Sequence, residues 1–277
     1  MLRKISLCLV FTTSLLSLTA QDVVDSAKTA EPSPKTFAVS GYVDAYYRFN
    51  FSNPKKESET FNNNTSFTNS QNSFELGMAS VKLEHSMGKV GVVADIGFGK
   101  RAEEFSYNDA STMVAIKQAY VTYAPSANLK LTAGSWGTHI GYELVDPYLN
   151  RNYSMSYMFS WGPFFHTGLK ADITSGKSGF MIGLANPTDL KSASVQRKFL
   201  IGQYSYGGDK VKLYLNYQGG TSDGEDDEDS KIQQGDIVIT GAVSDKFSIG
   251  YNGTLQSVKV RGSNKKFGDS DSWWGSA

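Results

Sequence analysis

The sequence predicts an all-β protein, a transmembrane antiparallel up-and-down β-barrel of at least 12 strands. Segments of about ten residues alternate apolar and polar side chains, which is the period of a strand with two unlike faces. Short turns and long polar loops alternate between these segments, whereas the connections of a Greek-key sandwich need not alternate. Aromatic residues reach 13% and glycines number 27, while prolines number only seven, a usage typical of many strands and turns.

The first twenty residues read as a secretory signal peptide. Arg3 and Lys4 precede an apolar stretch, and small residues precede Gln21. A membrane-anchoring helix is the alternative, but the stretch is short and rich in Thr and Ser. Residues 21–36 hold two prolines and no periodicity, so we expect a flexible periplasmic leader before a barrel domain over residues 37–277.

The first strand, residues 37–51, has an apolar face that includes Val39 and Val43, and we expect this face to meet lipid. Its second face carries Tyr42, Asp44, Tyr46 and Arg48, which we expect to face a lumen. Further strands are expected at 73–86, 90–99, a segment ending at 123, 129–137, 164–173, 179–185, 199–206, 211–218, 236–243 and 247–260, with a twelfth beginning at Trp273.

The connections predict the orientation. Short turns fall near residues 87, 125, 176, 208 and 245, and long loops near 60, 106, 150, 192, 226 and 267. In outer-membrane barrels the short turns are periplasmic and the long loops extracellular, so the N-terminus is expected in the periplasm. The sequence stops as the twelfth strand begins, so we expect the barrel to be incomplete at its C-terminus.

Three stretches resemble a known family: "SGYVDAYYRFNF" at 40–51, "QAYVTYAP" at 118–125 and "GYELVDPYLNRNYSMSYMFSWGPFFHTGLKA" at 141–171. They are similar to the OmpL-like β-barrel porins of bacterial outer membranes, from about Phe37 onward. The resemblance implies a Gram-negative outer-membrane barrel with a water-filled pore for passive diffusion of small hydrophilic solutes or ions. It carries over no catalytic motif.

Alternation also predicts which side chains line the pore. The candidates are Tyr42, Asp44, Tyr46, Arg48, Asp95, Lys130, Trp136, Lys170, Asp172 and Lys212. With Lys82 and Glu84 included, five basic residues face four acidic ones, so we expect weak charge selectivity. In the alternative, these charges pair across a filled barrel that conducts nothing, but 12 strands enclose more space than the filled eight-strand type.

Two loops are candidate parts of the pore. The aromatic-rich segment 140–163 holds Glu143, Asp146, Arg151 and Tyr153, and it either folds inward as a constriction or caps the barrel rim. A second loop places six acids at the mouth, namely Asp223, Glu225, Asp226, Asp227, Glu228 and Asp229. Its spacing does not match a helix–loop–helix calcium site, so a solvated loop that attracts cations is expected.

The charge balance, the cysteine content and the motifs argue against several other classes of protein. The 27 basic residues balance 27 acidic ones, which argues against a nucleic-acid partner. Cys8 lies in the signal peptide, so the mature chain has no thiolate metal site, and we expect neither metal nor cofactor. No GxSxG or HExxH motif is present, so we expect no enzyme.

Two alternatives to a pore stay open. One is an adhesin or binding protein that acts through its extracellular loops. The other is a rim-site hydrolase that uses His139 or His166, which flank the long loop. The expected partners are outer-membrane lipid and small hydrophilic solutes, and the sequence leaves open the solute, the pore size and whether the chain forms a homo-oligomer.

Overall fold

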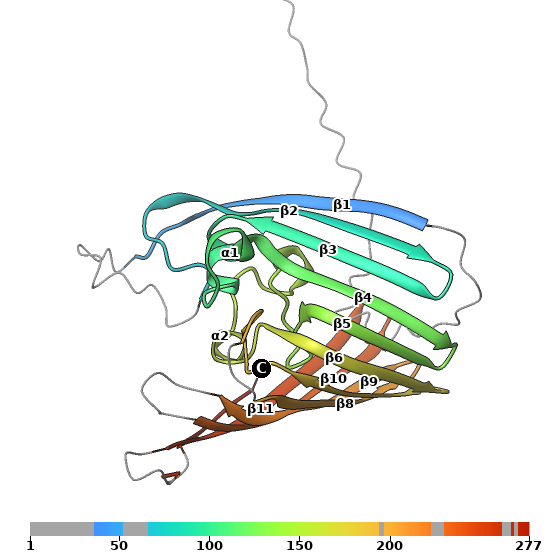
Figure 1. Cartoon of the computed structure of the whole chain (residues 1–277). Helices are drawn as coiled ribbons and strands as arrows, with labels where there is room; N and C mark the ends of the chain where they lie inside the picture. Colours follow the sequence, from blue (N-terminus) through green and yellow to red (C-terminus); the bar gives the residue numbers. More distant parts are fainter. Residues whose placement is uncertain are drawn as a thin grey trace, which may run out of the picture.

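The chain forms a single antiparallel sheet of 12 strands in the order β1 to β12, each paired with its neighbours in the sequence (Figure 1). The computed structural model describes residues 36–51, 66–193, 197–222, 230–261, 267–268 and 271–276. The predicted signal peptide, nearly all of the leader and the six acids at 223–229 lie outside these residues. The predicted all-β class and the up-and-down order are confirmed.

The strands follow the predicted segments, although two of them extend into the connection 219–235, which was predicted as a loop. They are β1 (Thr36–Arg48), β2 (Ser73–Met87), β3 (Val90–Phe98), β4 (Ile116–Ser126), β5 (Leu129–Gly137), β6 (Phe165–Ser175), β7 (Ser178–Ala185), β8 (Phe199–Gly207), β9 (Val211–Ser222), β10 (Ser230–Ser244), β11 (Phe247–Val260) and β12 (Asp271–Ser276). The helices are α1 (Lys100–Phe105) and α2 (Tyr157–Trp161), with 3-10 helices η3 (Ser111–Ala115) and η4 (Pro147–Leu149).

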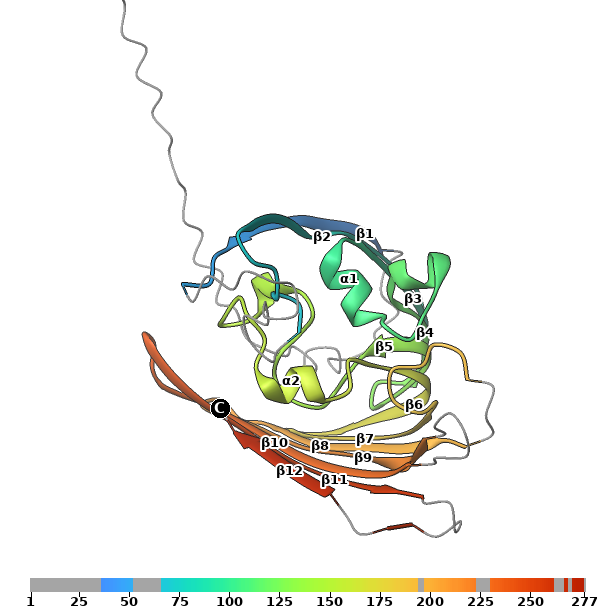
Figure 2. The ribbon, with the colours of Figure 1, turned by 90° about the vertical axis from the view of Figure 1, so that its left-hand side faces the viewer.

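The sheet curls around a central space but is not closed (Figure 2). Within the described residues, β1 pairs only with β2, and β12 pairs only with β11. The curl follows from the twist of adjacent strands, which accumulates over a sheet of this width.

The two faces of the sheet differ as the alternation predicts. The convex face exposes large apolar side chains from every part of the sheet, among them Val39, Val43, Leu169 and Ile249. Polar side chains gather on the concave face, where many are buried. Short turns join strands at one end, and at two of them Gly88 and Gly176 adopt φ near 60°, a conformation that favours glycine.

The long connections carry structure that alternation does not predict. In α1, Arg101, Ala102 and Phe105 are buried although the segment reads as a polar loop. In α2, the hydroxyl of Ser156 caps the helix by accepting a hydrogen bond from Phe159 N at 3.3 Å. No helix in the described part of the chain is long and apolar enough to cross a membrane.

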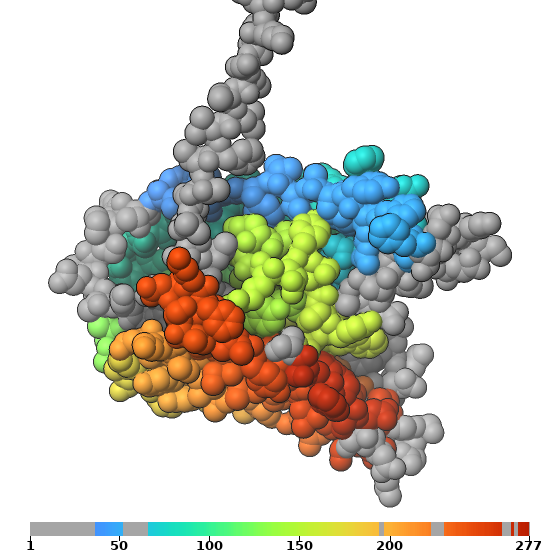
Figure 3. Space-filling view, turned by 180° about the vertical axis from the view of Figure 1, so that it is seen from behind, coloured from blue at the N-terminus to red at the C-terminus, as the bar shows by residue number. Residues whose placement is uncertain are grey.

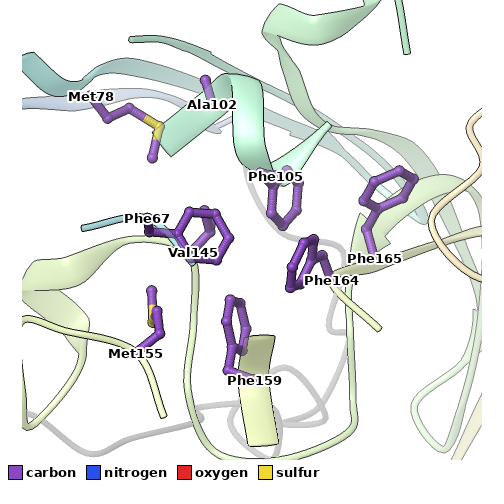
Figure 4. Close-up of a cluster of buried hydrophobic side chains, with 9 residues drawn as sticks. All are labelled: Phe67, Met78, Ala102, Phe105, Val145, Met155, Phe159, Phe164 and Phe165. Atoms are coloured by element: carbon purple, nitrogen blue, oxygen red, sulfur yellow. The ribbon is translucent and has the colours of Figure 1, made fainter. Parts of the chain in front are cut away.

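A hydrophobic core fills part of the concave side, away from the strands' outer face (Figure 4). Its buried members come mainly from three connections and not from strand alternation: Phe67, Met78, Ala102, Phe105, Val145, Met155, Phe159, Phe164 and Phe165. Stacked and edge-on ring contacts link Phe164 to Phe159 at 5.2 Å and to Phe67 at 5.3 Å. This core holds the connections together as one packed unit inside the sheet.

Candidate functional site

Residues 138–164, here called the inner segment, lie inside the curve of the sheet. Figure 2 shows the segment within the sheet, and Figure 3 shows it between β1, in blue, and the orange strands near the other edge. The Asp146 carboxylate accepts hydrogen bonds from Tyr42 Oη and Lys117 Nζ, both at 2.5 Å. Because Tyr42 is in the middle of β1, the segment meets the wall well below the rim.

Lys117 is the centre of a buried ionic network. Its ammonium lies 3.1 Å from Asp95 Oδ1 and donates to Ser80 Oγ at 2.9 Å. Ser80 in turn donates to Asp95 Oδ1 at 3.1 Å. Removing three charges from water is costly unless each is paired and hydrogen-bonded, and here each charge has a partner. Two carboxylates around one ammonium leave the network with a net negative charge.

Sequence alternation misses Lys117, because it would place this side chain on the outer face with Ala119 and Val121. The register of β3 with β4 shifts between Asp95 and Ile96, so that Asp95 pairs with Gln118 and Ile96 with Ile116. Lys117 is the extra residue of this β-bulge, and the bulge turns it inward. In the sequence, the inward position of Lys117 is indicated only by the occurrence of a lysine among the outward-facing positions of this strand, which are otherwise apolar.

A second contact joins the inner segment to the wall near Asp44. Tyr153 Oη donates to Asp44 Oδ2 at 2.7 Å, and the Tyr153 ring lies 5.5 Å from that of Tyr46. The buried guanidinium of Arg101 lies over the rings of Tyr153 and Phe67, at 5.2 and 5.5 Å. Its Nε is 3.9 Å from the same Asp44 oxygen. Cation–π and ionic contacts therefore compensate its charge.

The other predicted pore-lining residues also lie on the concave face. Tyr46 Oη donates to the Phe67 carbonyl at 3.4 Å, and Arg48 Nη1 to Thr68 Oγ1 at 3.1 Å. Lys170 lies 3.5 Å from Asp172 and 5.4 Å from the centre of the Trp136 ring, which is buried. Lys130 and Lys212 are half-buried on the same face.

Two of the predicted constriction residues behave differently from Asp146 and Tyr153. Glu143 is buried and accepts hydrogen bonds from the backbone and side chain of Ser156, the first at 2.9 Å. Burial raises the pKa of the Glu143 carboxyl, and these hydrogen bonds oppose the rise. Glu143 therefore links two parts of the inner segment to each other. Arg151 is exposed to solvent.

Between the inner segment and strands β1 to β4 lies a cavity of about 290 Å³, lined by both apolar and polar side chains. Side chains of both signs line it, including Lys82, Lys117, Asp95 and Asp146, together with the hydroxyls of Tyr42 and Tyr148. The rings of Tyr42 and Tyr148 meet edge-on at 4.7 Å. This arrangement can accommodate water and small polar solutes, but its charges are largely committed to one another.

The opposite wall, from β9 to β11, is built of amides that the sequence reading did not single out. Gln218 and Gln256 donate to Gln234 Oε1 at 2.8 and 3.3 Å, and Gln234 donates to Thr254 Oγ1 at 3.1 Å. The sequence pattern that could have identified them is the presence of Gln or Asn at inward-facing positions of three neighbouring strands.

A carboxylate in the same wall anchors the start of the inner segment. Asp236 accepts from Asn216 at 2.7 Å and Asn252 at 2.6 Å. It also accepts from Gly141 N at 3.0 Å. The inner segment is therefore fastened to both walls.

The two candidate histidines lie side by side, with ring centres 4.9 Å apart. His139 Nε2 bonds to the Tyr217 carbonyl at 3.1 Å, and His166 Nε2 to Thr138 Oγ1 at 3.2 Å. Burial lowers the pKa of His139 to about 4, so its ring is neutral at physiological pH. Among the described residues, no group of three or more His, Cys, Asp or Glu is placed to hold a metal ion.

A curled antiparallel sheet with an apolar convex face and polar side chains on its concave face is the architecture of an outer-membrane β-barrel. The chain belongs to the family described as "Putative beta-barrel porin-2, OmpL-like", which it matches over residues 36–277. The resemblance noted in the sequence is thereby confirmed.

Among solved structures, the chain is similar to "OmpTdeltaL8 (loop L8 deletion mutant of OmpT), an outer membrane protein of Vibrio cholerae", with 9% identity and a TM-score of 0.37 over 84% of each chain. No curated protein matches the chain.

Proposed function

We propose that this protein is a diffusion porin, which lets small hydrophilic solutes or ions pass through a water-filled lumen narrowed by the inner segment. The observation that carries the proposal is the attachment of Asp146 to Tyr42 and Lys117 in the middle of the wall. A segment anchored there, with a cavity beside it, would reduce the cross-section of a pore without filling it.

The proposed orientation follows from the connections. The short turns lie in the periplasm together with the N-terminus, and the long connections lie outside the cell. Residues 1–20 direct export and are removed. The apolar convex face meets outer-membrane lipid, and the solutes meet the concave face.

Weak charge selectivity is part of the proposal. The charges nearest the inner segment are engaged in pairs, such as Lys117 with Asp95 and Lys170 with Asp172, and the β9–β11 wall is mostly uncharged amide. Paired charges in a narrow space exert a smaller net field than single-sign rings, so ions of both signs are expected to pass.

We propose further that the chain is not an enzyme. The histidines that a rim-site hydrolase would use are buried, and their hydrogen bonds go to a carbonyl and a threonine hydroxyl. A general base needs access to the proton that it abstracts, which this position does not offer.

Single-channel recording of the full-length chain in planar lipid bilayers tests the proposal. We expect stepwise, ohmic currents. The double variant Tyr42→Phe, Asp146→Ala removes the hydrogen bonds that tie the middle of the inner segment to β1 and β4, and leaves the contact of Tyr153 with Asp44 in place. It should give larger and noisier steps.

The matched control is Tyr148→Phe, which removes a hydroxyl from the same segment. The ring of Tyr148 contacts Tyr42, but its hydroxyl is not part of the Asp146 network. This variant should conduct like the natural chain. Silent membranes containing correctly inserted protein would refute the pore and favour the adhesin reading.

A further inference from the structure

A second cavity, of about 540 Å³, lies beside α2 on the side of the inner segment away from the ionic network. The connections that hold α1, α2 and residues 188–189 line it together with side chains of β9, β10 and β11. Its volume falls within the range of small-molecule sites, which are typically about 300–1,000 Å³. The function proposed above makes no use of this cavity.

Two aromatic residues of this cavity are largely exposed. Trp161 is 63% exposed and Tyr107 is 58% exposed, and both line the cavity with Phe164. Tyr107 is held in place, because its hydroxyl donates to Asp189 Oδ2 at 3.2 Å and its ring meets Phe164 edge-on at 5.8 Å. Rings left uncovered in a cavity offer their faces to a ligand.

Two polar atoms in the lining have no hydrogen-bond partner although they are buried, Glu104 Oε1 and Thr188 Oγ1. The other Glu104 oxygen, Oε2, accepts from Phe67 N at 2.5 Å, which fixes the carboxylate. The nearest cation to Oε1 is Lys100 Nζ at 3.8 Å. A buried carboxylate oxygen without a donor is costly unless a ligand or water supplies one.

The charge of the lining selects the class of ligand. Within the described part of the chain, the lining includes the carboxylates of Glu104 and Asp189 but no lysine or arginine. The Asp189 carboxylate already accepts from the backbone amides of Phe164 and Phe165, so Glu104 is the one with a free acceptor. Carboxylates repel anions, whereas aromatic faces beside a carboxylate attract ammonium groups by cation–π and ionic contacts.

We propose that this cavity binds a small organic ammonium cation, with Glu104 as its charge partner and Tyr107 and Trp161 as its aromatic contacts. The cation lies against the exposed rings, within ionic range of the Glu104 carboxylate. The site does not depend on conduction, so it goes beyond the diffusion pore proposed above.

Isothermal titration calorimetry of the full-length chain in detergent micelles tests the site, with choline chloride as the probe. The matched neutral compound is the carbon isostere of choline, in which a tert-butyl group replaces the trimethylammonium group. Choline should bind about tenfold more tightly than its isostere, as expected where a cation–π contact adds to an ionic one. Glucose should not bind measurably.

The charge partner is tested with Glu104→Gln, which keeps an oxygen for Phe67 N. This change should weaken choline binding about tenfold and leave binding of the isostere unchanged. The control is Glu103→Gln on the same helix, since the Glu103 side chain is 65% exposed and pairs with the same Lys100 at 3.7 Å without lining the cavity. It should bind choline nearly as the natural chain does.

Two further substitutions should change the affinity for choline in directions that a purely structural role of these residues would not produce. Lys100→Gln should tighten choline binding, because it removes the cation that competes for Glu104. Trp161→Phe should retain most of the binding, whereas Trp161→Ala should lose it.

Three outcomes would overturn the site: no heat of binding with choline, equal affinity for the isostere or glucose, or equal losses in Glu103→Gln and Glu104→Gln. None of them bears on conductance, so a failure here is distinct from a failure of the pore.

Discussion

Asp189 joins three connections through a single carboxylate. Its Oδ1 accepts from the backbone amides of Phe164 and Phe165, at 2.7 and 3.1 Å, and its Oδ2 accepts from Tyr107 Oη. Burial raises the pKa of the Asp189 carboxyl to about 7, although these hydrogen bonds act in the opposite direction. The end of the inner segment is therefore tied to a group that ionises near neutral pH.

The sign of the resulting pH dependence follows from this raised pKa. Well below the ordinary Asp pKa of about 4, the carboxyl is neutral in both the folded and unfolded chain, and it affects stability little. As the pH rises to 7, the unfolded chain ionises freely while the folded chain resists. The free energy of unfolding therefore falls over this window, by an amount of at most about 4 kcal/mol, and is constant above it.

Replacing Asp189 with Asn should remove this fall in the free energy of unfolding, because Asn keeps an acceptor for the two backbone amides and cannot ionise. The variant should match the natural chain near pH 4 and exceed it in stability at pH 8, as measured by urea unfolding in detergent micelles. The matched control is Asp209→Asn, since that carboxylate pairs with Lys177 in an exposed turn. A variant that is less stable at pH 8 than the natural chain would contradict the burial argument.

At the scale of the element, each strand has a lipid face and an interior face, and β4 shows this with two adjacent residues. Val121 is 50% exposed on the convex face and pairs with Val92 and Ala133. Thr122, the next residue, is half-buried on the concave face and pairs with Gly91 and Thr132.

Val121→Arg should destabilise the protein by roughly 2–4 kcal/mol, because it places a charge against the hydrocarbon core. Thr122→Arg introduces the same side chain one position away, into a polar interior, and should cost little. Unfolding by guanidinium in lipid vesicles measures both. Equal losses in the two variants would show that the assignment of the faces is wrong.

For the whole molecule, charge is distributed unevenly over the concave face. Charged side chains gather on β1 to β6, where Lys117, Asp95, Lys170 and Asp172 are paired. The β9–β11 wall carries mainly the amides of Gln218, Gln234 and Gln256, together with the carboxylate of Asp236 and the ammonium of Lys212. The described interior therefore contributes a weak field, and the six acids within 223–229 would set the preference for ions at the mouth.

We expect the pore to prefer cations weakly, and this preference should shrink as the salt concentration rises. The Debye length falls from about 10 Å at 0.1 M to about 3 Å at 1 M, so the acids act over a shorter range at high salt. Replacing the six acids with Asn and Gln should abolish the salt-dependent part without changing conductance at 1 M. Reversal potentials in a KCl gradient, at two mean salt levels, measure this.

A preference for cations that survives the replacement would have to come from the inner segment, where Asp146 and Glu143 are the candidates. A strong preference for anions would contradict the charge assignment altogether.

Alternation and the lengths of the connections were sufficient to predict the class, the strand order and the two faces of the sheet. This succeeds because a strand's period of two is a local constraint that each segment obeys separately, and because the backbone groups of each segment must pair with a neighbouring strand in lipid. The segment 129–137, for example, was predicted at the bounds that β5 has in the structure.

The interior was decided by tertiary structure. The sequence left open whether residues 140–163 fold inward, and it missed Lys117, the Gln218–Gln234 ladder and the cavity beside Trp161. These features depend on a β-bulge, on pairing between side chains far apart in the sequence, and on three connections that share one apolar core. No local period encodes such contacts, because each becomes favourable only when the curled sheet has brought its partners together.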